Sequence, residues 1–274
     1  MMKNKQILEK LIVVSVIVIY FIFGRTLTYF SSTDVFIDFA KKIGFSIKHL
    51  ANYISILFYI IHLMLYLLLF SNDISQKDIY ISKLTNRKPK KIISIIIVSF
   101  TIFAFLVSSI SIPIGTKFNN SIIGAVVSFL LMVLFAPIAE ELFFRVILIN
   151  HLRRNYEYTI KKIILIQAFL FYIPHLLNGN YTLYTFYIGI ISGIFYYYTE
   201  SIIYSIILHS LANCATFLLT LNVINYRLPI TTPIWFVLFI FLFAFFYYML
   251  RNLVKILEKH ELEPENSNFE KKDV

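Results

Sequence analysis

Eight long apolar stretches constrain the fold of this 274-residue chain more than any other feature. A helix needs about 20 predominantly apolar residues to cross the hydrocarbon core of a bilayer, and each stretch reaches or approaches that length. The chain is 59% hydrophobic, above the roughly 45 to 50% of a soluble domain. We therefore expect an all-α, polytopic membrane helix bundle with about eight transmembrane helices, at approximately 8–24, 49–70, 92–112, 121–149, 163–178, 182–198, 201–221 and 230–252.

The domain organisation is expected to be simple, because no internal repeat is visible in the sequence. Asn178-Gly179-Asn180 separates the fifth and sixth stretches and predicts a tight hairpin between two helices. We expect a single membrane-embedded domain over residues 1–257, with its motifs within 120–220. The tail 258–274 is polar enough to be disordered in the cytoplasm.

The distribution of Lys and Arg predicts the orientation, because cytoplasmic loops of membrane proteins retain positive charge. With eight spans and an inside N-terminus, 18 of the 25 Lys and Arg residues fall in inside segments and six in outside segments, while Arg145 lies within a span. We therefore expect a multi-pass protein of the cell membrane with both termini in the cytoplasm. The richness in Ile, Lys, Asn, Tyr and Phe is typical of AT-rich coding and favours a bacterial source.

The net charge of +10 does not indicate nucleic-acid binding. The basic residues flank apolar stretches instead of forming a stripe on a separate domain, and anchoring at the bilayer explains them. The single cysteine, Cys214, excludes an intrachain disulfide and a thiolate metal cluster, and we expect it to pack within the seventh span. The first stretch resembles a signal peptide but is expected to be retained, since no small-x-small cleavage site follows it.

Two adjacent glutamates, Glu140 and Glu141, lie in the apolar segment 129–148 and share it with one other charged residue, Arg145. A charge at bilayer depth costs roughly 2.5 to 3.5 kcal/mol on insertion scales, and such residues mark sites by default. On a helix Glu141 and Arg145 can pair at four-residue spacing, while Glu140 points about 100 degrees away and can face a cavity as a general base. A structural ion pair between helices is the alternative. Pro137 loosens the backbone hydrogen bonding just before the pair, which membrane helices tolerate where neighbours or water satisfy the freed carbonyl.

Polar residues on two later stretches are expected at the same depth as Glu140. The fifth stretch contains His175, and the seventh contains His209 and Asn213 on one helix face. At 1.5 Å rise per residue, Glu140 lies about 15 Å from the cytoplasmic end of its helix, His175 about 18 Å and His209 about 12 Å. Three helices thus place costly polar groups in one layer, which indicates a shared site. His62, at about 12 Å, is expected to be a hydrogen-bonded interhelical residue or to support the site from behind.

These residues together resemble a known family. The motifs Glu140-Glu141-x-x-x-Arg145, Phe171-x-x-x-His175 and His209-x-x-x-Asn213, in this order on successive helices, are similar to those of the CPBP family of intramembrane proteases, also called Abi. This family includes the type II CAAX prenyl endopeptidases and proteins linked to bacteriocin processing and self-immunity. The resemblance implies an intramembrane glutamic endopeptidase with no metal and no cofactor.

The resemblance also implies a role for each residue. Glu140 would activate a water with help from His175, while His209 and Asn213 would stabilise the oxyanion on the scissile carbonyl. The residues supporting the site would be Glu141, Arg145 and Phe171. The expected partners are the lipid bilayer and a membrane-associated substrate, either a CAAX-type protein or a leader, bacteriocin or signal peptide. The site would open toward the cytoplasm or the inner leaflet.

Three alternatives remain open. Two His and a Glu can form a catalytic zinc site with water as the fourth ligand, although no His-Glu-x-x-His motif is present. A serine intramembrane protease would use Ser192 of Ile191-Ser192-Gly193, whose small residues are equally explained by helix packing. The third alternative is non-enzymatic: a bacteriocin self-immunity or regulatory protein that binds a peptide in the same cavity, or a proton-coupled transporter with a carboxylate relay.

Overall fold

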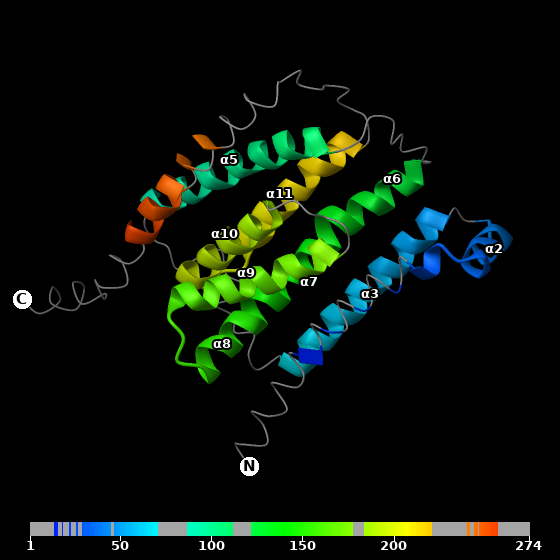
Figure 1. Ribbon diagram of the computed structural model, residues 1–274, viewed down its shortest axis with the longest axis horizontal. Coiled ribbons are helices and arrows are strands. Elements are labelled where there is room, and N and C mark those ends of the chain that lie inside the picture. The colour runs from blue at the N-terminus through cyan, green and yellow to red at the C-terminus, as the bar shows by residue number, and fades with distance from the viewer. Residues whose placement is uncertain are drawn as a thin grey trace, which may run out of the picture.

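The computed structural model describes residues 29–44, 47–70, 87–111, 122–177, 184–220 and 247–256, together with a few isolated positions within 14–26 and 240–245. These residues form helices, and no strand occurs among them. The long helices run side by side, and the short helix α2 (Asp34–Lys42) lies beyond one end of α3 (Ile47–Phe70) (Figure 1). The predicted all-α class is therefore confirmed for this part of the chain.

One continuous helix from Ile122 to Asn155 forms the centre of the bundle. Its five parts are α6 (Ile122–Phe129), the π-helical segment η1 (Leu130–Phe135), α7 (Ala136–Glu141), the π-helical segment η2 (Leu142–Ile149) and α8 (Asn150–Asn155). Pro137 lies in the first turn of α7, and the two glutamates end it. π-Helical turns are uncommon and occur frequently at functional sites. The single apolar stretch predicted here is thus a helix whose hydrogen bonding changes on both sides of the glutamates.

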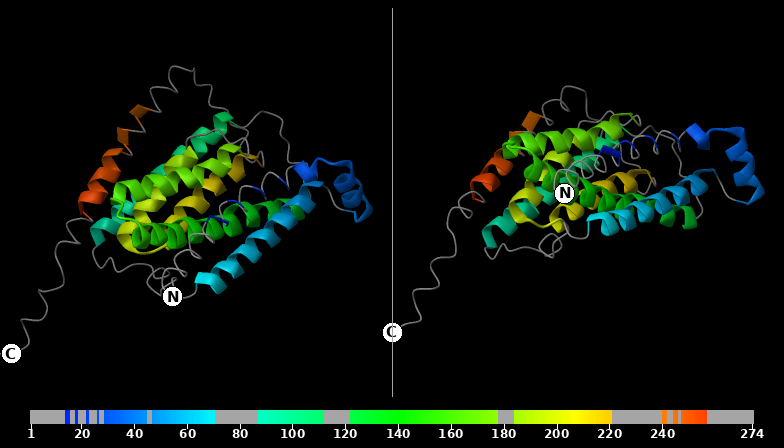
Figure 2. Two further views of the ribbon diagram at one scale, coloured as in Figure 1. Left: turned by 60° about the horizontal axis from the view of Figure 1, so that its bottom comes forward. Right: turned by 90° about the horizontal axis from the view of Figure 1, so that it is seen from below.

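Helices pack against two sides of this central helix. On one side α3 contacts α6, η1 and α7. On the other side lie α9 (Ile160–Leu177), α10 (Tyr184–Thr199) and α11 (Ile203–Thr220), and α5 (Arg87–Ser111) packs against α11. Figure 2 shows the same neighbours from two further directions. The glutamate turn is therefore enclosed by helices that are distant from it in sequence.

Six of the predicted stretches coincide with helices, namely those at 49–70, 92–112, 121–149, 163–178, 182–198 and 201–221. α5 and the central helix extend past the apolar limits, to Arg87 and Asn155, because hydropathy marks the apolar run and not the end of the hydrogen-bonded helix. Most of the first and eighth stretches, the hairpin 178–180 and the tail 258–274 lie outside the described residues. The number of transmembrane helices and the orientation of the termini stay predictions.

The sequence analysis did not predict α2. Thr33 caps this helix by accepting a hydrogen bond from the backbone N–H of Phe36 at 3.4 Å. Asp34 lies in its first turn, and Lys41 and Lys42 lie in its last turn, which matches the signs that the helix dipole favours. These local signals outweigh the modest length of the segment.

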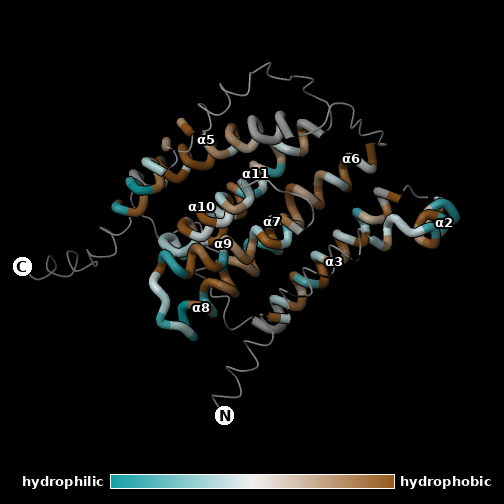
Figure 3. The backbone as a smooth tube through the Cα atoms, viewed as in Figure 1, coloured by the Kyte–Doolittle hydropathy of each residue, from teal (hydrophilic) through white to brown (hydrophobic). Residues whose placement is uncertain are grey.

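The bundle exposes apolar side chains and buries ionisable ones. Exposed apolar residues lie on several helices, among them Leu57 and Met64 on α3, Val98 and Ile102 on α5, and Leu165 and Phe169 on α9. Hydrophobic colour dominates these helices in Figure 3, while hydrophilic residues gather at α2 and α8. Soluble monomers rarely expose apolar surface of this extent. Among the described helices, the central helix is long and apolar enough by itself to cross a membrane.

Candidate active site

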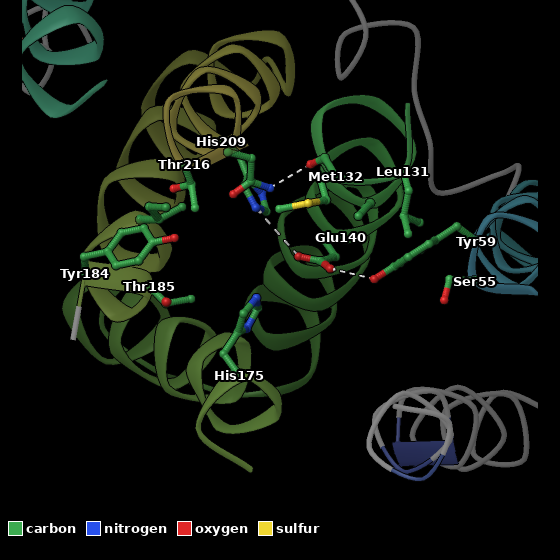
Figure 4. A pocket seen from close by; sticks show the side chains of 13 residues that line it. Ser55, Tyr59, Leu131, Met132, Glu140, His175, Tyr184, Thr185, His209 and Thr216 are labelled. Atoms are coloured by element: carbon green, nitrogen blue, oxygen red, sulfur yellow. Dashed lines mark hydrogen bonds and ion pairs between the residues drawn. The ribbon is translucent and has the colours of Figure 1, made fainter. Parts of the chain in front are cut away.

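A cavity of about 320 Å³ lies beside the glutamate turn, within the size range of roughly 300 to 1,000 Å³ typical of ligand sites. Its walls come from α3, the central helix, α9, α10 and α11 (Figure 4). Four predicted catalytic residues line it, namely Glu140, His175, His209 and Asn213. The structure thus brings together the polar groups that the sequence placed in one layer. Their catalytic roles stay predictions.

Glu141 and Arg145 form the buried ion pair that their spacing predicts. Both side chains are 0% exposed. Nε of Arg145 donates to Oε2 of Glu141 at 2.7 Å, and Nη2 donates to Oε1 at 3.0 Å. Nη1 of Arg145 donates to Oε1 of Gln167 on α9, and the guanidinium lies 5.0 Å from the ring centroid of Phe171. A buried charge pair is stable when its geometry is bidentate and further hydrogen bonds satisfy the remaining groups, as here.

Gln167 connects this ion pair to α10, a contact that the sequence analysis missed. Its Nε2 donates to the carbonyl oxygen of Gly189 at 2.7 Å. A Cβ atom at Gly193 would collide with Nε2 of Gln167, and one at Gly189 would lie 2.9 Å from Cα of Ala168. The two glycines therefore let α10 approach α9 closely enough to hold Gln167, and through it Arg145.

His209 on α11 lies between the two glutamates. Its Nδ1 is 3.0 Å from Oε1 of Glu141, and its Nε2 is 3.9 Å from Oε2 of Glu140. The Glu141 carboxylate offers only acceptor oxygens, so Nδ1 of His209 carries the proton of this hydrogen bond. Glu141 therefore does more than pair with Arg145. It also fixes the His209 ring with Nε2 toward Glu140 and the cavity.

Glu140 lines the cavity and accepts a hydrogen bond from α3. The hydroxyl of Tyr59 donates to Oε1 of Glu140 at 3.1 Å (Figure 4). The sequence analysis did not select Tyr59, although a signal was present. Polar residues recur at three- and four-residue spacing along one face of this otherwise apolar helix, at Asn52, Ser55, Tyr59, His62 and Tyr66. That face meets the central helix, since Nδ2 of Asn52 donates to Oγ of Ser128 at 2.7 Å.

His62 is not among the residues that line the cavity. Its Nδ1 is 2.9 Å from the carbonyl oxygen of Phe58. Its ring centroid lies 3.8 Å from that of Phe58 and 5.9 Å from that of Tyr66. These contacts all lie within α3, so the interhelical role of His62 stays a prediction.

Phe171 organises the two histidines of the site. Nδ1 of His175 is 2.9 Å from the carbonyl oxygen of Phe171, which can only accept, so Nδ1 carries the proton. In the neutral ring Nε2 then holds a lone pair. The buried ring of Phe171 lies 5.0 Å from the His175 ring and 5.5 Å from the His209 ring. One aromatic side chain thus contacts both histidines and Arg145.

Asn213 satisfies a backbone carbonyl that Pro137 leaves open. In the π-helical segment η1 a bond to the carbonyl of Met132 would come from the residue five positions later. That residue is Pro137, which has no N–H. Nδ2 of Asn213 donates to the carbonyl oxygen of Met132 at 2.8 Å instead. A side chain of a neighbouring helix therefore satisfies this carbonyl.

Ser192, the alternative serine nucleophile, and Cys214, the single cysteine, do not line the cavity. Ser192 is buried against α11, where its carbonyl oxygen accepts a hydrogen bond from Oγ of Ser205 at 3.0 Å, as the packing explanation predicts. Cys214 is partly buried on α11 as a free thiol. Within the described ranges, no group of three His, Cys, Asp or Glu side chains is arranged to hold a metal ion.

Residues 120–215 match a family model described as Type II CAAX prenyl endopeptidase Rce1-like. This match covers about a third of the chain and supports the predicted resemblance to the CPBP family. The matched segment contains all three motifs and every predicted site residue. The Rce1-like family is a membrane-embedded protease family, which agrees with the apolar outer surface of this bundle. No curated protein and no solved structure matches the chain.

The buried ion pair between Glu141 and Arg145 can be tested by removing its charges in two steps. We expect Arg145→Met to lower the free energy of unfolding by about 3 to 5 kcal/mol, because it leaves the Glu141 carboxylate buried without its cation. Adding Glu141→Gln removes that charge, so the double variant should recover most of the loss. Thermal unfolding in detergent micelles measures both variants. A double variant as unstable as Arg145→Met would show that Arg145 acts through packing and not through its charge.

Proposed function

We propose that this protein is an intramembrane, glutamate-dependent endopeptidase. It hydrolyses a peptide bond of a membrane-associated protein or peptide with a water that Glu140 and His175 activate. The observation that carries the proposal is the convergence of Glu140, His175, His209 and Asn213 from three helices on one cavity. The match to a CAAX prenyl endopeptidase model supports a peptide as the substrate class.

Glu140 and His175 supply two acceptors for the protons of a water nucleophile. The Tyr59 hydroxyl holds Oε1 of Glu140, and Oε2 lies on the side of His209. Neutral His175, with its proton on Nδ1, offers the lone pair of Nε2. A general base positioned in this way contributes roughly 10²- to 10⁴-fold to a hydrolytic rate.

His209 and Asn213 supply donors for the oxyanion. When His209 takes a second proton on Nε2, the Glu141 carboxylate at Nδ1 stabilises the imidazolium, and Nε2 can donate. The Asn213 amide uses one N–H on the Met132 carbonyl and has a second N–H to donate. In a studied protease the loss of one such donor lowers kcat by roughly 10²- to 10³-fold.

The proposed reaction balances with water as the only co-reactant. The water oxygen bonds to the scissile carbonyl carbon while its proton passes to Glu140. The C–N bond then breaks, and the proton moves from Glu140 to the leaving nitrogen. One carboxylic acid and one amine are formed, and the carboxylate of Glu140 is restored. No metal takes part in these steps.

The substrate of the proposed reaction is a CAAX-type protein or a leader, bacteriocin or signal peptide at the membrane. We place the opening of the site toward the cytoplasm or the inner leaflet, because the distribution of Lys and Arg favours cytoplasmic termini. The lipid bilayer is the second partner, since apolar side chains cover the outer surface.

Glu140→Gln tests catalysis, because it nearly preserves the shape of the side chain and removes the base. We expect cleavage to fall at least about 100-fold. Comparative peptidomics of cells that carry the wild-type protein or Glu140→Gln should then show membrane peptides cleaved with the wild type alone. Ser192→Ala, a buried change outside the cavity lining, is the matched control and should keep the wild-type products. A cell phenotype that survives Glu140→Gln would instead indicate an immunity or regulatory role.

Chelation separates this mechanism from a zinc enzyme with two His ligands and one Glu ligand. We expect the purified protein to keep its full cleavage rate after dialysis against a chelator, because Glu140 and His175 activate the water without a metal. The measurement is the rate of product formation before and after dialysis, with metal content verified by elemental analysis. Loss of cleavage that added Zn²⁺ restores would contradict the proposed mechanism.

Tyr59→Phe tests whether the hydroxyl on α3 fixes the base. It removes one hydrogen bond to a carboxylate and keeps the aromatic ring, so we expect kcat to fall about tenfold. KM should stay near the wild-type value, because the hydrogen bond that is lost holds Glu140. Steady-state kinetics on a cleaved peptide measures both constants. Tyr53→Phe, on the outer face of the same helix, is the control, and an unchanged kcat in Tyr59→Phe would contradict the assignment.

A further inference from the structure

Thr185, in the first turn of α10, forms part of the cavity wall and has no role in the proposed chemistry. Its side chain is 3% exposed and projects into the cavity on the side opposite Glu140 (Figure 4). Its Oγ1 has no hydrogen-bond partner among the described residues. A buried hydroxyl that forms no hydrogen bond is unfavourable, so this position calls for a partner that enters the cavity.

Other helical threonines of the bundle avoid this situation. The hydroxyls of Thr101, Thr199 and Thr216 donate to the carbonyl oxygen four residues earlier, at 2.8, 2.6 and 3.2 Å. Such bonding to the preceding turn is the usual solution for a threonine inside a helix. Thr185 is the second residue of α10, so no turn of that helix precedes it, and its hydroxyl forms no hydrogen bond among the described residues although the residue is as buried as Thr199. Its hydroxyl therefore stays available at the cavity.

Ser192 shows that an unpartnered hydroxyl alone does not mark a site. It lies two turns further along the same helix, is fully buried, and its Oγ likewise has no partner among the described residues. It does not line the cavity, whereas Thr185 does. What distinguishes Thr185 is the combination of an unpartnered hydroxyl with a position facing Glu140 and His175 across open volume.

We propose that Thr185 binds the main chain of the substrate peptide on the cavity wall opposite Glu140. This inference rests on the proposed endopeptidase function. A hydroxyl both donates and accepts, so it can pair with a peptide N–H or a peptide carbonyl. Every peptide carries these groups, and the contact is therefore independent of the substrate's side chains. Thr185 aligns the peptide and takes no part in proton transfer, because it lies across the cavity from the base.

Thr185→Val removes the hydroxyl and keeps the shape of the side chain. We expect KM to rise roughly 3- to 10-fold with kcat unchanged, because the lost hydrogen bond serves the bound substrate and the transition state equally. Peptides with different side chains should lose the same factor. Thr185→Ser keeps the hydroxyl and should restore the wild-type KM. Ser192→Ala, the other unpartnered hydroxyl of α10, should leave both constants at their wild-type values.

The probes are two fluorogenic peptides that end in a farnesylated CAAX-type sequence and differ in their aliphatic residues. Cleavage is measured with the full-length protein in lipid nanodiscs. Binding of the same peptides to Glu140→Gln and to Glu140→Gln with Thr185→Val is measured by fluorescence anisotropy. The dissociation constant of the double variant should be roughly 3- to 10-fold higher for both peptides.

The outcomes separate this inference from the function on which it rests. Main-chain binding by Thr185 is refuted if Thr185→Val changes neither KM nor the dissociation constant, or changes them for one peptide alone. Neither result contradicts the proposed endopeptidase function. A loss that Thr185→Ser fails to restore also refutes main-chain binding by Thr185. If the wild type binds both peptides in a Thr185-dependent way without cleaving them, main-chain binding by Thr185 is supported and the proposed endopeptidase function is refuted. Absence of both binding and cleavage refutes both.

Discussion

The buried ion pair between Glu141 and Arg145 determines how the surrounding helices meet. A charge in an apolar interior is tolerated when its hydrogen-bonding groups are satisfied, and the two residues satisfy each other only in part. Gln167 of α9 accepts from the guanidinium, and His209 of α11 bonds to the carboxylate. Gln167 in turn donates to Gly189 of α10. Three helices are thus fixed around one pair of opposite charges. The need to satisfy the hydrogen-bonding groups of this pair therefore sets the geometry of the site.

The backbone of the central helix contributes a second constraint of the same kind. Pro137 cannot donate to the carbonyl of Met132, and the side chain of Asn213 does so instead. A missing backbone donor on one helix therefore positions an amide on another. The same turn carries Glu140 at its end, so the irregular hydrogen bonding of the helix and the placement of a proposed oxyanion donor have a common cause.

Hydropathy and the placement of charged residues predicted most of the described helices and the buried charges of the site. The features that they missed depend on contacts between helices. Apolar length located six helices, and the cost of burying charge identified Glu140, Glu141 and Arg145 before any contact was known. Gln167 was not found, because a single uncharged polar residue in an apolar stretch belongs to no motif or repeated spacing. The π-helical turns were also missed, since apolar length and composition do not distinguish them from α-helix. The polar stripe on α3 was a readable signal, because its spacing repeats over five positions.

The different parts proposed for the two glutamates agree with the partners that each of them meets. Neighbouring residues on a helix point about 100 degrees apart, so the pair faces two environments. Glu141 faces the bundle interior, where Arg145 balances its charge and holds it as a carboxylate. Glu140 faces the cavity, where a phenol hydroxyl holds one oxygen and an imidazole lies 3.9 Å from the other. Glu141 therefore holds His209, Glu140 is left to the proposed role of a base for water, and both carboxylates approach His209.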